Sequence, residues 1–195
     1  MKKILDSRKT AFIVLIAVIL IFTPIGVVRS LNSVADSVED MFTDGVELSE
    51  DGSIATSGTT YTSASIQSLL DSEAKNALGL ITVGAAYDAA DDETAELRAA
   101  REDLIGTSDI SELGVAHTRL CSAADALYEK LSELELSSTD RVNADDYYEN
   151  ITQIAGSISI NKYNDVVTEF YEVTLSRFPA NLFASLVSGP QYFGE

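Results

Sequence analysis

An uncharged, apolar stretch at residues 11–28 limits the folds open to this chain more than any other feature. Only Thr23, Pro24 and Gly26 interrupt it, and Lys9 and Arg29 flank it. A helix of this length reaches about 27 Å, close to the ~30 Å hydrocarbon thickness of a bilayer. The residues before Arg29 are bulky where a signal peptidase requires small ones. We therefore expect an uncleaved transmembrane signal anchor over residues 10–28, in preference to a cleaved signal peptide or a soluble core helix.

Charge is distributed unevenly along the chain. The 195 residues carry a net charge of −18, with +4 on residues 1–29 and −22 on residues 30–195. The positive-inside rule predicts a single-pass protein of the cell membrane, with residues 1–9 as a cytoplasmic tail and the acidic body outside. An acidic body does not neutralise phosphates, so nucleic acid is not an expected partner.

The rest of the chain shows apolar residues at helical spacing and no signal for a β-hairpin or a βαβ unit. Residues 29–61 are predicted as a helical extension of the anchor followed by a flexible acidic loop, because Leu31, Val34, Val38 and Met41 form a helical stripe. Residues 62–184 are predicted as a helical bundle domain and residues 185–195 as a C-terminal tail. The expected fold class is all-α: an N-terminal transmembrane helix that continues into an elongated antiparallel bundle of three to four long helices.

Three helices are predicted within the bundle domain. The first begins near Ser65, bends at Gly79 or Gly84 and ends near Gly106. The second begins after Asp109, with Glu112 as its capping-box partner. The third runs over residues 143–177 and ends before Pro179, because the residue before a proline avoids the helical region. Its apolar stripe predicts these core residues: Ile151, Ile154, Ile158, Val166 and Phe170.

Chemistry-bearing residues are few. One His and one Cys do not supply a zinc site of the usual His/Cys type or a disulfide framework. His117 and Cys121 are four residues apart on a predicted helix face, but no nucleophile elbow accompanies them, and packing is their expected role. Acidic runs such as residues 91–93 lack the order of a calcium loop and are expected to be solvated. No catalytic residue, metal site or cofactor is predicted.

The C-terminal end contains the pair Tyr163-Asn164 and then Phe178-Pro179-Ala180-Asn181-Leu182. This pattern resembles the LemA family. Its members have a Tyr-Asn pair in the last helix, followed by a stop similar to Phe-Pro-Ser-Asn-Leu-Ile-Ala. The matching positions here are candidate binding residues: Tyr163, Asn164, Phe178, Pro179, Asn181 and Leu182. The acidic segment 44–58 replaces the family's basic run and Pro-Asn-Leu, which marks a divergent member. The resemblance implies a single-span, mostly helical envelope protein of non-enzymatic or unassigned activity.

Two classes of function remain at this stage. The first is a membrane-anchored interaction or scaffold protein, whose partners are the lipid bilayer and other envelope proteins or a second copy. The alternative is a membrane-anchored sensor or small-ligand-binding bundle. The segment around Phe178 has two interpretations as well, a recognition motif or a structural cap folded onto the bundle. The cap is favoured, because exposed aromatic clusters are uncommon on monomers.

Overall fold

The computed structural model describes residues 8–55 and 59–194, so most of the predicted cytoplasmic tail lies outside the described residues. The side chains of residues 8–11, 13–14 and 16–22 are also outside the description. The chain is divided into two compact units. Unit 1 combines the segment up to Glu39 with Val167–Pro190, and unit 2 combines Asp40–Val166 with Gln191–Glu195. This division falls inside the bundle domain predicted for residues 62–184.

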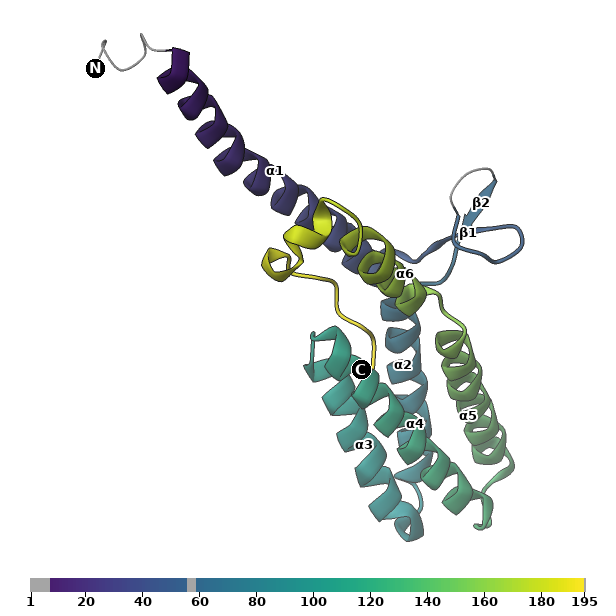
Figure 1. Ribbon diagram of the computed structural model, residues 1–195. Helices are drawn as coiled ribbons and strands as arrows, with labels where there is room; N and C mark the ends of the chain where they lie inside the picture. The colour runs from purple at the N-terminus through teal and green to yellow at the C-terminus, as the bar shows by residue number, and fades with distance from the viewer. Residues whose placement is uncertain (1–7, 56–58, 195) are drawn as a thin grey trace. The chain divides into compact units, whose positions relative to one another are not determined.

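Unit 2 contains a four-helix bundle, in agreement with the predicted helical bundle (Figure 1). Its helices are α2 (Ile66–Gly84), α3 (Asp91–Gly106), α4 (Ile110–Ser132) and α5 (Ser138–Ser159). Each helix packs against the next along the chain, and α5 returns to pack against α2. Leucines at helical spacing fill the centre and are fully buried: Leu70, Leu80, Leu97, Leu120, Leu127 and Leu131. Short connections between consecutive helices produce this up-and-down order.

Polar side chains fix where the bundle helices begin. The carboxylate of Asp109 accepts hydrogen bonds from the backbone N–H groups of Ser111 and Glu112, which confirms the predicted start of α4. The carboxylate of Glu112, the predicted capping-box partner, instead accepts a hydrogen bond from the Thr107 hydroxyl at 2.9 Å. Ser65 caps α2 in the same way, by accepting from the N–H of Ser68.

One hydrogen-bond network joins the turn after α2 to the start of α5. The hydroxyl of Tyr87 donates to Oδ2 of Asp140 at 2.7 Å and accepts from the N–H of Ser137 at 3.1 Å. The Ser137 hydroxyl also donates to Asp140 Oδ2, at 2.7 Å. Hydrogen bonds from Tyr87 and Ser137 stabilise the ionised carboxylate and lower the pKa of Asp140.

The prediction of one helix from Ser65 to Gly106 is wrong. The chain leaves α2 at Gly84, passes through a short 3₁₀ turn at Asp88–Ala90 and starts α3 at Asp91. A Cβ atom at Gly84 would lie 2.3 Å from the hydroxyl oxygen of Thr94 on α3, so the glycine permits the close approach of the two helices. The apolar residues after Gly84 therefore continue a helical stripe on a separate, antiparallel helix.

The long helix predicted over residues 143–177 is also divided. After α5 ends at Ser159, α6 (Tyr163–Glu169) begins, and a π-helical turn follows at Phe170–Leu175. The side-chain oxygen of Asn161 accepts from the N–H of Tyr163, and its amide donates to the carbonyl of Ala64. Asn161 thereby starts a new helix. Of the predicted core residues, Ile154 is only half-buried, whereas Ile151, Ile158, Val166 and Phe170 are buried.

The segment predicted as a flexible acidic loop contains a small antiparallel sheet. Strand β1 (Glu47–Ser49) pairs with β2 (Thr60–Thr62), with Leu48 opposite Tyr61. Gly45 and Gly52 adopt positive φ values of 90° and 80°, which glycine tolerates without steric cost. Three-residue strands are too short to produce a clear alternating pattern, so the sequence analysis missed them.

Unit 1 combines most of α1 (Arg8–Asp44) with the segment that follows Val167. Leu31, Ala35 and Val38 of α1 are buried, but Val34, predicted on the same stripe, is 41% exposed. The N–H of Ser188 donates to the side-chain oxygen of Asn32 at 3.1 Å, which ties the C-terminal segment to α1. The helix ends two residues beyond the predicted end near Phe42.

The transmembrane part of the predicted fold class is contradicted. Across the residues that the structure describes, no helix is long and apolar enough to cross a membrane. The side chains of residues 10–11, 13–14 and 16–22 of the predicted span lie outside the described residues.

Candidate functional site

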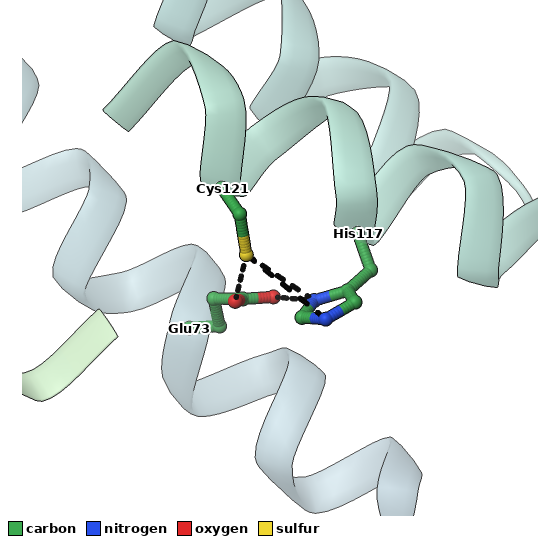
Figure 2. A group of neighbouring side chains, drawn as sticks. All are labelled: Glu73, His117 and Cys121. Atoms are coloured by element: carbon green, nitrogen blue, oxygen red, sulfur yellow. Dashed lines mark hydrogen bonds and ion pairs between the residues drawn. The ribbon is translucent and has the colours of Figure 1, made fainter. Parts of the chain in front are cut away.

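The only His and the only Cys of the chain meet a buried carboxylate inside unit 2. His117 and Cys121 lie four residues apart on α4, and their side chains point toward Glu73 of α2 (Figure 2). Residues four apart on a helix share one face, which explains how α4 presents both groups together. The facing helix supplies the third group, so the cluster depends on how α2 packs against α4.

Short distances connect the three side chains. Nδ1 of His117 lies 2.8 Å from Oε2 of Glu73, and Sγ of Cys121 lies 3.3 Å from Oε1 of the same carboxylate. The Cys121 sulfur is 3.8 Å from Nδ1 and 4.0 Å from Nε2 of the imidazole. Each carboxylate oxygen of Glu73 therefore has its own partner on α4.

Burial makes the negative charge of Glu73 energetically costly unless a partner compensates it. Glu73 is fully buried, whereas 14% of the His117 side chain is exposed. Among the described residues, no Lys or Arg forms an ion pair with Glu73, and His117 is its single basic partner. Desolvation raises the pKa of the Cys121 thiol well above its ordinary value, and the neighbouring Glu73 carboxylate raises it further.

A cleft of about 370 Å³ opens beside His117. Gly114 and Thr118 of α4 line it, together with Asn164 and Phe193. The centroids of the His117 and Phe193 rings are 6.0 Å apart. The imidazole therefore lies between a buried carboxylate and a cleft.

The sequence analysis placed His117 and Cys121 on one helix face but assigned them to packing and missed Glu73. A signal for Glu73 was present in the apolar stripe of α2. Leu70 precedes it by three residues and Ala77 follows it by four, and both are buried. A carboxylate at a core position of a helix requires a polar partner, and this requirement identifies the residue as unusual.

The candidate binding residues Tyr163 and Asn164 hold the C-terminal end within unit 2. Tyr163 is fully buried, packs edge-on against Phe42 and donates its hydroxyl proton to the carbonyl of Gln191 at 2.9 Å. The Asn164 side chain forms two hydrogen bonds with the backbone of Phe193: its amide donates to the carbonyl, and its oxygen accepts from the N–H. Both residues therefore have an intramolecular structural role.

The other four candidates lie in unit 1 and are exposed. Phe178 is 80% exposed and Leu182 is 64% exposed, and Pro179 and Asn181 between them are exposed as well. Leu186, four residues further, is also 64% exposed. Phe178 and Leu182 are therefore mostly exposed within unit 1, and the structural cap on the bundle stays a prediction.

Comparisons of this chain with protein-family models, with curated proteins and with solved structures give no match. The relationship to the LemA family thus remains a prediction based on the motif residues.

Proposed function

We propose that this protein is a helical interaction or scaffold protein that acts by binding a partner protein and not by turning over a substrate. The observation that carries the proposal is the exposure of three large apolar side chains along one segment of unit 1: Phe178, Leu182 and Leu186, hereafter called the apolar ridge. Large exposed apolar side chains gathered on one segment are typical of an interaction site. The proposed relationship to the LemA family is consistent with this role.

A groove beside the apolar ridge supports this function. It has a volume of about 650 Å³, and Ile25 and Val28 of α1 line it together with Leu186. Arg29 and Asp36 lie at the same groove and supply charges of both signs. An apolar anchor surrounded by polar groups is the usual arrangement of a protein–protein interface.

The charge of the chain indicates the chemistry of the partner. Residues 30–195 carry a net charge of −22, so a basic surface around an apolar anchor complements this protein best. Salt screens attraction of this kind, and we expect partner binding to weaken as ionic strength rises.

The state of Cys121 supports binding over covalent catalysis. A cysteine nucleophile reacts as a thiolate and requires a lowered pKa, whereas burial and Glu73 raise the pKa of Cys121. The proximity of His117 therefore does not by itself indicate an activated thiol.

Crosslinking in intact cells, followed by recovery of bound proteins, tests the proposal. The ridge variant Phe178→Ser/Leu182→Ser/Leu186→Ser should recover at least about tenfold less partner than the wild type, because anchors at interface centres carry most of the binding energy. The matched control changes three unit 2 residues of similar exposure: Ile105→Ser/Val115→Ser/Val142→Ser. Equal recovery by the ridge variant, or a turnover activity of the purified protein, would contradict the proposal. Recovery of only the chain itself would identify the partner as a second copy.

A further inference from the structure

We propose that Glu73, His117 and Cys121 form a binding site for a divalent transition-metal ion of the zinc type, with three protein ligands and one further coordination position. This site is independent of the apolar ridge and goes beyond the proposed interaction function. The three potential ligand atoms lie within 4.8 Å of one another. Carboxylate oxygen, imidazole nitrogen and thiolate sulfur are the ligands that zinc takes in proteins.

The spacing of the three groups fits a tetrahedral ion. Zinc bond lengths place neighbouring ligand atoms about 3.4–3.6 Å apart in a tetrahedron. The observed separations are 2.8 Å from Oε2 of Glu73 to Nδ1 of His117, 3.3 Å from the other carboxylate oxygen, Oε1, to Sγ of Cys121, and 3.8 Å from Sγ to Nδ1. Shifts of roughly half an ångström would therefore admit the ion. Two ligands at i and i+4 on one helix are a common way to present a metal site.

Charge provides the second, independent argument. Glu73 is fully buried, and a buried carboxylate is usually paired with a cation or coordinates a metal. A divalent ion balances one carboxylate and one thiolate, so the occupied site has no net charge. The acidic body also attracts cations from solution and raises their local concentration.

The protons balance as follows when a metal ion binds. The thiol of Cys121 loses its proton to solvent, and the sulfur–metal bond replaces the S–H bond. With Nδ1 of His117 as the ligand atom, the neutral ring carries its proton on Nε2. The thiol therefore releases one proton for each ion bound, an imidazolium ring paired with Glu73 releases a second from Nδ1, and no electron is transferred. A coordinated metal ion deprotonates a thiol even where burial opposes ionisation.

The three residues leave one coordination position of a tetrahedral ion without a protein ligand. Of the three, His117 also lines the cleft of about 370 Å³. Three protein ligands with one open position allow a water molecule or a small ligand to complete the coordination. This arrangement differs from a closed structural zinc site, in which protein atoms fill all four positions.

Cobalt(II) and zinc binding to the full-length protein, in the presence of a phosphine reductant, tests this inference. With cobalt we expect a thiolate-to-metal charge-transfer absorption in the near ultraviolet, which zinc abolishes by displacement. Zinc titration in weak buffer should release at least one proton per ion. Cys121→Ser and His117→Gln should each lower zinc affinity by at least about 100-fold, since even the loss of groups behind metal ligands costs 10–100-fold.

Matched variants distinguish zinc binding at this site from binding to surface carboxylates and from a loss of affinity caused by misfolding. Glu129→Gln removes an exposed carboxylate from the same helix and should leave the affinity unchanged. Circular dichroism checks that each variant folds. Glu73→Gln removes the buried carboxylate charge; if that variant does not fold, Cys121→Ser, which is the smallest change, still tests the site. Without a charge-transfer band, or with equal zinc affinity in wild type and Cys121→Ser, the cluster is a buried ion pair only and the inference is wrong.

Discussion

Two segments of the C-terminal region have similar apolar content and opposite environments. The apolar ridge in unit 1 exposes Phe178, Leu182 and Leu186, whereas Phe193 is half-buried where the chain ends in unit 2. The difference does not follow from hydrophobicity. It follows from backbone partners, because Tyr163 and Asn164 bind the backbone of Gln191 and Phe193.

This contrast shows what docks a terminal segment. A terminal segment outside helices and sheets needs partners for its backbone N–H and C=O groups before its side chains can be buried. The Asn164 side chain supplies both a donor and an acceptor. Gly114 has no side chain, which leaves space for the backbone of Gly194. Four predictions test this contrast, in order of decreasing expected effect.

Tyr163→Ala should reduce the free energy of unfolding by about 3–5 kcal/mol, because it removes a fully buried aromatic ring. Tyr163→Phe is the matched control. It keeps the ring and removes only the hydrogen bond to Gln191, for about 1 kcal/mol. Urea unfolding followed by circular dichroism measures both values. Equal losses would mean that the hydroxyl, and not the ring, anchors the end.

Gly114→Val should destabilise the protein by about 3 kcal/mol and release the docked end. A Cβ atom at this position would lie 2.2 Å from Cα and 2.3 Å from N of Gly194. Both are backbone atoms that cannot rotate away. Gly156→Ala has space, with nothing within 4 Å, and should stabilise α5 by about 0.5–1 kcal/mol. The same urea experiment compares the two. A neutral Gly114→Val would show that the end does not dock at α4.

Asn164→Leu should cost about 1–2 kcal/mol, since it leaves the N–H and C=O of Phe193 without their side-chain partner. Asn181→Leu changes the exposed asparagine of the same motif and should stay within about 0.5 kcal/mol of the wild type. Thermal unfolding of the two variants gives the comparison. Similar melting temperatures would contradict the structural role of Asn164.

The ridge variant Phe178→Ser/Leu182→Ser/Leu186→Ser should change the free energy of unfolding least, by about 0.5 kcal/mol or less per site. Exposed side chains that are not packed contribute little to stability. This result would also show that any loss of partner recovery reflects binding and not unfolding. A total loss above about 3 kcal/mol in urea unfolding would mean that the ridge packs against the chain.

The sequence predicted the local features of this fold better than its long-range ones. The start of α4 at Asp109 was found because a capping side chain acts within three residues. The division at Gly84 was missed because the apolar stripe continues through it. Only the packing of Thr94 against that glycine shows why the chain turns there.

The candidate site shows the same limit. The i, i+4 spacing placed His117 and Cys121 on one face, but Glu73 lies 44 residues before His117 and reaches it only through the packing of α2 on α4. Similarly, the motif residues Tyr163 and Phe178 look alike in the sequence, and only the structure separates a buried ring from an exposed one.

The Tyr87 hydroxyl connects two corners of the bundle that are about fifty residues apart in the chain. Because its partner Asp140 has a lowered pKa in the folded state, this connection is present at neutral pH and is lost as the pH falls through that lowered value. The turn after α2 and the first turn of α5 should therefore open as one cooperative unit. Their amide hydrogens should exchange with deuterium together, and their protection, measured relative to the intrinsic exchange rate at each pH, should fall first in acid.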